Sequence, residues 1–173
     1  EETLLKRMMP NSKEAEGAVI GSMIMDRDSI VKASEMLTKD DFYYSQYGIL
    51  FETMVELYNE GAPVDLITLQ NRLREKNVPP EISSLEYVRD LYETKPVSAN
   101  TEHYAKIVSE KAVLRRLIKV AENIENDCYQ ETDSLDGILE QTEKNIFGLL
   151  QNRSVDDYVP IQKVVMNALD RIE

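Results

Sequence analysis

The stretch over 98–151 constrains the fold more than any other part of the chain, because it predicts two consecutive amphipathic helices with a turn near 130–134. Apolar residues recur there every three or four positions, which places them on one helix face. The first stripe comprises Tyr104, Ile107, Val108, Leu114, Leu117, Ile118, Ala121, Ile124 and Cys128. The second comprises Leu135, Ile138, Leu139, Ile146, Leu149 and Leu150. Two helices cannot bury two such stripes completely against each other, so we expect apolar surface to remain for a partner.

Helix-forming residues dominate the composition, and strand-like alternation is nearly absent. The chain has 173 residues with only six glycines and six prolines, and this length suits one ordinary domain or two small ones. We therefore predict an all-α fold. It comprises a compact multi-helix globular subdomain over 1–96, a long antiparallel helical hairpin over 97–151, and a polar linker with a tethered amphipathic helix over 152–173.

Capping signals divide the first part of the globular subdomain into short helices. Asn11 with Glu14 has the form of a capping box, which predicts a helix that ends near Met25. Asp28 is expected to cap the next helix, which runs through Leu37.

Turn residues then mark the later helices of the subdomain. A third helix is predicted over 45–60, with Gly61 as the residue that ends it, and Asp65 is expected to cap a fourth. The Pro79–Pro80 pair predicts a loop, and Ser83 is expected to open the helix that follows. In the hairpin, Asp133 or Ser134 is expected to cap the returning helix.

The charge of the chain is strongly negative and locally concentrated. The formal net charge is -12, and the segment over 120–143 carries eight acidic residues without a lysine or arginine. Such a surface repels a phosphate backbone, so we expect no direct DNA binding. The acidic surface is either a solvated face or a face that meets a basic partner protein.

The sequence offers no constellation for catalysis, cofactor binding or metal binding. A P-loop needs a glycine followed by lysine, and none of the six glycines precedes one. The candidate zinc ligands His103 and Cys128 lie about seven turns apart on one predicted helix. Acidic residues such as Glu14 and Glu16 lie in the first turn of a capped helix, where we expect them to favour the helix dipole. We therefore expect no catalytic residue, cofactor or metal in this fragment.

The remaining reactive and aromatic side chains are predicted to pack. Cys128, the single cysteine, lies on the first stripe and is expected to be a small buried apolar side chain. Tyr43, Tyr44 and Tyr47 could stack on bases, but no basic groove accompanies them in the sequence, so we assign them to packing. No run of about 18 apolar residues occurs, so we expect a cytoplasmic protein without a membrane span.

Four sequence blocks follow one another along nearly the whole chain. They are PNSKEAEGAVIGS over 10–22; FY, ILF and GAPVD within 42–65; PVSAN and YAKIV within 96–108, followed by Lys111, Arg115 and Leu117; and DYVPI with ALDRIE within 157–173. In this order they resemble the N-terminal part of bacterial replicative DNA helicases of the DnaB family.

The resemblance implies a collar of paired subunits, in which six such domains form a ring. A RecA-like ATPase domain, with ATP and Mg²⁺, is expected beyond this part of the chain. The implied partners are further copies of the chain, from dimer to hexamer, together with primase and a helicase loader. The resemblance implies that the full-length protein is an ATP-dependent DNA helicase. We expect that this fragment by itself is not an enzyme.

Three sets of residues are candidates for these contacts. The hairpin interface between subunits is predicted to use Ile107, Leu114, Leu117, Ala121, Leu139, Ile146 and Leu150. Residues that face primase, or that support that surface, are predicted to be Tyr104, Ile118 and Ile124, for which the alternative role is packing inside the hairpin. The linker helix is predicted to dock on a neighbouring subunit through Ile161, Val164, Val165, Leu169 and Ile172.

Other classes of function stay open at this point. A helical protein-interaction adaptor outside any helicase would need the same exposed apolar surface. A small hydrolase with a carboxylate pair would show a pocket lined by titratable residues with perturbed pKa values. A nucleic-acid-binding helical domain would show salt-dependent DNA binding.

Overall fold

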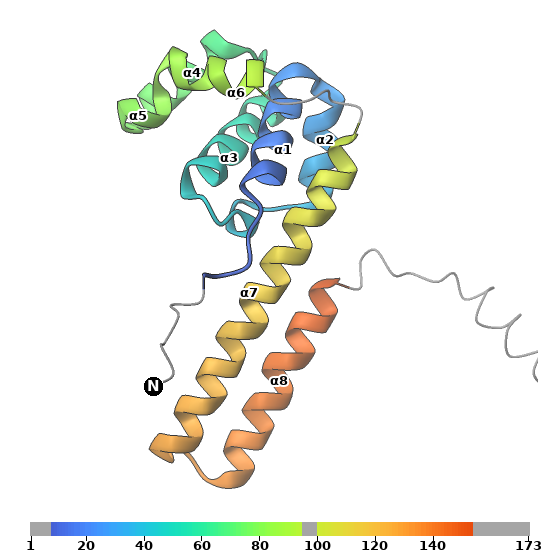
Figure 1. Cartoon of the computed structure of the whole chain (residues 1–173), viewed down its shortest axis with the longest axis vertical. Coiled ribbons are helices and arrows are strands. Elements are labelled where there is room, and N and C mark those ends of the chain that lie inside the picture. The colour runs from blue at the N-terminus through green and yellow to red at the C-terminus, as the bar shows by residue number, and fades with distance from the viewer. Residues whose placement is uncertain (1–7, 95–99, 154–173) are drawn as a thin grey trace, which may run out of the picture. The chain divides into compact units, whose positions relative to one another are not determined.

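The computed structural model describes residues 8–94 and 100–153, and every regular element in those ranges is a helix (Figure 1). The elements are, in chain order, α1 Lys13–Met25, α2 Arg27–Met36, the 3₁₀ helix η1 Lys39–Asp41, α3 Ser45–Asn59, α4 Leu66–Glu75, α5 Pro80–Ser83, α6 Leu85–Thr94, α7 Thr101–Gln130 and α8 Leu135–Arg153. The prediction of an all-α fold is confirmed.

The chain divides into two compact units that meet at Arg115 and Arg116, rather than near residue 96. The later boundary arises because the first part of α7 belongs to the globular unit. Ala105, Val108 and Ala112 on this helix are buried there. We call the part up to Arg115 unit 1 and the part from Arg116 unit 2.

The core of unit 1 is built around α1. Every residue of α1 over 15–24 is buried, because α1 packs on α2, α3 and α6. Over these residues the helix therefore has no solvent-exposed face, and Gly17 and Gly21 are among the buried residues. The largest fully buried apolar side chains of the unit are Ile20, Met23, Ile30, Leu50, Met54, Leu69 and Leu73.

The first two helix starts lie close to the predicted positions but use other capping residues. Ser12, not Asn11, caps α1, because its hydroxyl accepts a hydrogen bond from the Ala15 N–H at 3.2 Å. Asp26, not Asp28, caps α2, and its carboxylate accepts from the Asp28 N–H at 3.1 Å. In both cases the capping residue has the extended backbone that is typical of an N-cap position. The residue that the sequence predicted as the cap lies one or two positions away from it.

The middle of unit 1 agrees with the predicted signals. Gly61 follows α3 with a φ of 72°, a left-handed conformation that favours glycine. Asp65 caps α4 by accepting from the N–H groups of Ile67 and Thr68. Gly48 is required for a different reason: a Cβ atom there would lie 2.8 Å from the Lys39 carbonyl oxygen, so η1 and α3 could not approach as they do.

The Pro79–Pro80 prediction is wrong in part. Pro80 begins the short helix α5 instead of lying in a loop, which is consistent with the preference of proline for the first position of a helix. Ser84, not Ser83, accepts a hydrogen bond from the Tyr87 N–H at the start of α6, at 3.2 Å.

The burial pattern of α4 predicts a large difference between two neighbouring substitutions. Leu69→Ala removes a fully buried side chain and is expected to lower the free energy of unfolding by about 2–5 kcal/mol. Ile67→Ala, on the same helix, truncates a side chain that is 65% exposed and should change it by less than about 0.5 kcal/mol. Urea unfolding followed by circular dichroism measures both. Equal losses would contradict the burial of Leu69.

Candidate protein-interaction surface

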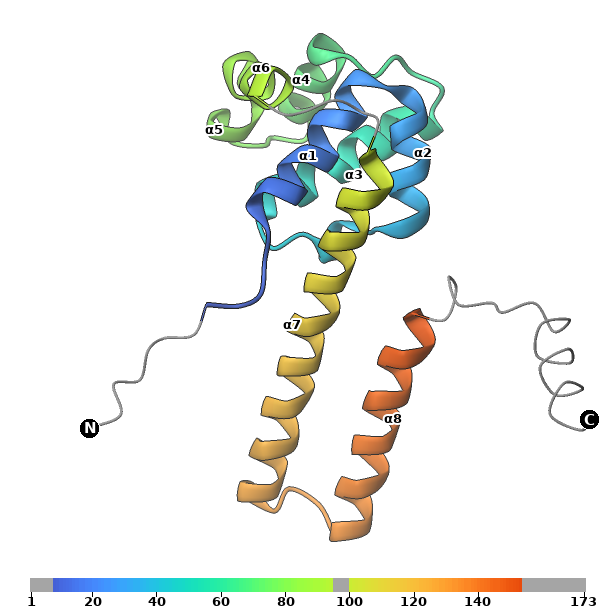
Figure 2. The same cartoon turned by 45° about the vertical axis from the view of Figure 1, so that its right-hand side comes forward.

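Unit 2 contains the helical hairpin that the two stripes predict. Residues 116–130 of α7 and the helix α8 run antiparallel and side by side in both views (Figures 1 and 2). The connection occupies residues 131–134, where Glu131 has a φ of 46°. The Ser134 hydroxyl accepts a hydrogen bond from the Gly137 N–H at 3.2 Å, so Ser134 is the capping residue of α8.

The hairpin leaves much of its apolar surface in contact with water. Every side chain described over 116–151 is at least partly exposed. Leu139 is 57% exposed, and Leu150 is 59% exposed. When a partner removes exposed aliphatic surface of this kind from water, the free energy becomes more favourable by about 25 cal/mol per Å² of buried surface. The structure therefore has the surplus apolar surface that the sequence predicts.

Most of the predicted subunit-interface residues lie on this exposed surface of unit 2, namely Leu117, Ala121, Leu139, Ile146 and Leu150. Leu114 is also exposed, but it belongs to unit 1. Ile107 differs from them because it is half-buried and packs against the core of unit 1.

The predicted primase-facing residues also occupy different surroundings. Tyr104 packs against the core of unit 1 and is half-buried. Ile118 is exposed, whereas Ile124 is half-buried within unit 2. Ile118 is therefore the more accessible of the two isoleucines, at 36% exposure, and Ile124 is the more buried one. The predicted docking residues Ile161, Val164, Val165, Leu169 and Ile172 lie outside the described residues.

Two aromatic residues of the hairpin escaped the sequence analysis. Phe147 and Tyr129 are both exposed, but neither falls on the stripe of its helix. The one feature of the sequence that could have indicated Phe147 is that it directly follows Ile146, which lies on the apolar stripe. Cys128 is also exposed, so the prediction that it is buried is wrong: the described part of unit 2 has only two helices, and they leave this side chain uncovered.

A buried carboxylate in unit 1 holds the backbone at the start of α3. Glu16 is 1% exposed and accepts hydrogen bonds from the N–H groups of Tyr43 at 2.9 Å and Tyr44 at 3.1 Å. Tyr44 is the capping residue of α3 and has no side-chain capping bond of its own. Glu16 therefore serves the start of a different helix, rather than the dipole of its own helix as the sequence suggested.

Arg115 ties three separate segments together beside this carboxylate. Its guanidinium donates to the Pro10 carbonyl at 2.8 Å and to the Asp41 carbonyl at 2.7 Å. It also lies over the Tyr43 ring, 5.6 Å from the centroid. The segment before α1, the helix η1 and the helix α7 are thus joined through one side chain of unit 1.

The tyrosines of this cluster pack as the sequence predicts. Tyr47 is buried, and Tyr44 makes edge contacts with the rings of both Tyr43 and Tyr47. Lys13 lies over the Tyr44 ring at 5.6 Å. Two cations, Lys13 and Arg115, therefore accompany the aromatic rings, although the sequence alone indicated none.

Burial determines the ionisation of Glu16. Loss of hydration raises the pKa of this carboxyl above its ordinary value, and the hydrogen bonds from the Tyr43 and Tyr44 amides and the charge of Arg115 oppose the rise. The folded protein therefore favours the protonated form of Glu16 more than the unfolded chain does.

The described residues contain no group of three or more His, Cys, Asp or Glu side chains placed to hold a metal ion. Among the helices that the structure describes, none has the length and apolar character needed to cross a membrane.

The chain belongs to the DnaB-like helicase N-terminal domain family, which matches residues 8–110. The replicative DNA helicase DnaC of Bacillus subtilis is 35% identical over 167 residues, which cover 96% of this chain and 37% of that protein. The replicative DNA helicase DnaB of Geobacillus stearothermophilus is 36% identical over 172 residues, covering 99% of this chain and 38% of that protein. The chain thus spans little more than a third of these relatives.

Solved structures show the same fold. The N-terminal domain of DnaB helicase from Mycobacterium tuberculosis superposes with a TM-score of 0.75 at 28% identity, covering 82% of this chain and 99% of that one. The corresponding domain from Helicobacter pylori, described together with its interactions with primase, has a TM-score of 0.59 at 21% identity. Its match covers 67% of this chain and 90% of that one. At this identity, the match to the Helicobacter pylori domain supports only the similarity of the fold.

The buried carboxylate predicts a specific dependence of stability on pH. Because the pKa of Glu16 is raised in the folded state, its stabilising contribution is complete below the ordinary glutamate pKa and is lost as the pH rises through the raised value. Relative to Glu16→Gln, the wild type should therefore lose unfolding free energy as the pH rises from the ordinary glutamate pKa through the raised pKa of Glu16.

Denaturant titrations across this pH range measure the difference. Glu14→Gln is the matched control, because it removes an exposed carboxylate from the same helical turn. Identical pH profiles for the two variants would contradict the role assigned to Glu16.

Proposed function

We propose that this chain is the assembly-forming N-terminal collar part of a hexameric replicative DNA helicase. The exposed apolar surface of the hairpin carries the proposal, since membership of the family by itself leaves the interface undefined. Pairing of hairpins from two subunits would cover Leu117, Leu139, Ile146 and Leu150, and three such pairs would complete a ring of six. The helix α8 also carries the exposed Phe147, which adds aromatic surface.

The geometry of α8 favours pairing along its length. Leu139, Ile146 and Leu150 are spaced by seven and four residues, so they share one face of the helix. All three are exposed. Residues with this spacing form a continuous strip, which suits another helix better than it suits a small ligand.

We also propose primase as a partner of the collar and a helicase loader as a further one. The description of the Helicobacter pylori domain with primase supplies the class of partner. In this chain, Ile118 is the accessible candidate for the contact, and Ile124 supports it from within the hairpin. The acidic segment over 120–143 suits a partner with a basic surface.

The chemistry of the helicase is proposed to reside elsewhere in the full-length protein. The relatives are replicative DNA helicases of which this chain covers little more than a third. ATP hydrolysis with Mg²⁺ and the unwinding of DNA at the replication fork are therefore proposed for the full-length protein, in which this chain would organise the subunits and their partners.

A charge placed on the exposed face of α8 should break the assembly. Ile146→Glu is expected to shift the chain from oligomer to monomer, because pairing would bury a carboxylate in apolar surroundings without a partner. Light scattering over a series of protein concentrations measures the mass. Gln141→Glu introduces the same charge at an exposed polar position of α8 and should leave the mass unchanged.

Ile146 is 42% exposed in the isolated chain, so the substitution should leave the helical circular dichroism signal intact. A folded Ile146→Glu variant that assembles as fully as the wild type would refute pairing through this face.

Primase binding should distinguish Ile118 from Ile124. Ile118→Ala is expected to weaken binding of the cognate primase about fivefold, the effect of about 1 kcal/mol of lost apolar contact, with little loss of stability. Ile124→Ala is expected mainly to lower the free energy of unfolding, because this side chain is half-buried. Calorimetric titration and thermal unfolding on the same samples measure the two effects. Unchanged affinity of folded Ile118→Ala would remove this residue from the interface.

A further inference from the structure

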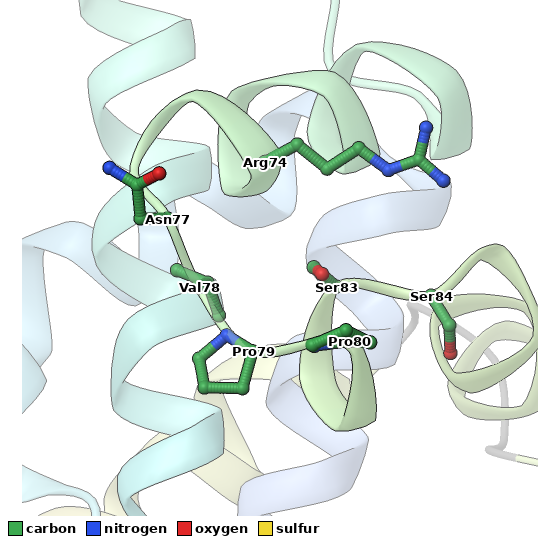
Figure 3. Close-up of a pocket in the computed structure, with 7 residues that line it drawn as sticks. All are labelled: Arg74, Asn77, Val78, Pro79, Pro80, Ser83 and Ser84. Carbon is green, nitrogen blue, oxygen red and sulfur yellow. The ribbon is translucent and has the colours of Figure 1, made fainter.

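Unit 1 carries an open cavity of about 360 Å³ between the end of α4 and the start of α6. Its lining residues are Arg74, Asn77, Val78, Pro79, Pro80, Ser83 and Ser84. Figure 3 shows Arg74 along the α4 side of the opening, with Pro79 and Pro80 on the opposite side and Ser83 between them. All seven residues belong to unit 1, so the cavity is independent of the hairpin surface.

Arg74 is the only charged residue in the lining. With the Gln70 amide in the orientation that satisfies both of its polar atoms, the Gln70 oxygen accepts from Arg74 at 3.1 Å and from the Leu85 N–H at 3.1 Å. A guanidinium has five N–H donors, so most remain available. Arg72, on the same helix, is paired with Glu60, whereas no ion pair to Arg74 occurs among the residues that the structure describes.

Ser83 supplies a second, independent sign of a ligand. The residue is 3% exposed, and its N–H donates to the Pro79 carbonyl at 3.0 Å. Its hydroxyl, in contrast, forms no hydrogen bond with any residue in the described ranges. In these ranges, every side-chain nitrogen or oxygen atom that is sealed from solvent has a hydrogen-bond partner. The Ser83 hydroxyl is therefore not sealed from solvent, and Ser83 is one of the residues that line the cavity.

The lining is complementary to an acidic group beside an aliphatic one. Arg74, the Asn77 amide and the Ser83 hydroxyl offer hydrogen-bond donors, while Val78 and the two prolines offer apolar walls. No carboxylate lines the cavity, although the chain has a net charge of -12. A carboxylate paired with an arginine gains a charge-assisted and often bidentate hydrogen bond.

We propose that this cavity docks a short acidic segment of a partner protein, with one carboxylate on Arg74 and a flanking aliphatic side chain against Val78, Pro79 and Pro80. The openness of the site favours a peptide over a free small molecule. Arg74, Asn77 and both prolines are exposed, whereas small-molecule sites bury most of their ligand. A peptide gains further contacts beyond the rim, and the prolines hold the wall in place before binding.

Fluorescence anisotropy with the full chain and a labelled, C-terminally amidated peptide GSLDLS tests the proposal. The peptide GSLNLS, in which an amide replaces the only carboxylate, is the ligand control. We expect saturable binding of GSLDLS and at least about tenfold weaker binding of GSLNLS, as for the loss of one charge-assisted hydrogen bond.

Variants of the chain locate the site. Arg74→Gln should weaken binding of GSLDLS about tenfold, and Ser83→Ala about threefold. Arg89→Gln removes the same charge from an exposed position on α6 outside the lining and should change binding less than about twofold. Circular dichroism confirms that each variant is folded, and Arg74, being exposed, should tolerate the change.

Several results would overturn the proposal. These are the absence of saturable binding, equal binding of the two peptides, or equal losses in folded Arg74→Gln and Arg89→Gln. Full displacement of GSLDLS by an equal concentration of inorganic phosphate would show a simple anion site and overturn the assignment to a peptide. None of these outcomes depends on the oligomeric state, so they are separable from a failure of the proposed collar function.

Discussion

The burial of α1 over residues 15–24 is the constraint on which the rest of unit 1 depends. Because α2, α3 and α6 surround this helix, every residue over 15–24 must suit an interior. That interior includes the carboxylate of Glu16, which is stable there because it accepts two backbone N–H groups at the start of α3. A buried acidic residue in a core helix thus positions the start of another helix. Arg115 continues the same arrangement by joining the segment before α1 to η1 and α7.

The hairpin follows the opposite rule, because it has too few elements to enclose its own apolar residues. Two helices remove only part of each stripe from water, and the exposed fractions of Leu139 and Leu150 reflect this geometry. Unit 1 thus encloses a core of buried side chains, whereas unit 2 leaves apolar side chains exposed. The proposed association would use this exposed surface of unit 2. The cavity beside Arg74 lies on unit 1 and extends its role to binding without weakening its core.

Periodicity and helix-breaking residues predicted most of the elements, since these signals are local. The stripes of the hairpin, the stop at Gly61 and the cap at Asp65 need only neighbouring residues for their interpretation. The capping residues of α1 and α2 were misplaced by one or two positions, because several adjacent polar residues satisfy the same pattern. The sequence did not indicate that the compact units divide at Arg115 and Arg116, because the spacing of Ala105, Val108 and Ala112 looks the same whether they face a core or a partner helix. The prediction that Cys128 is buried was wrong for the same reason, because its position on a stripe does not show whether a neighbouring element covers it.

The sequence by itself determined the all-α class, the order of the helices, the acidic character and the family to which the chain belongs. These properties depend on local propensity and on motifs that can be compared residue by residue. Only the tertiary structure decided that Glu16 serves the start of α3, that Arg115 joins three segments, and that Ser83 and Arg74 line one cavity. Each of these pairs residues that are distant or differently oriented in the chain, and no periodic pattern encodes which side chains meet. Exposure was likewise a tertiary result, because an apolar stripe does not specify how much of it the folded chain covers.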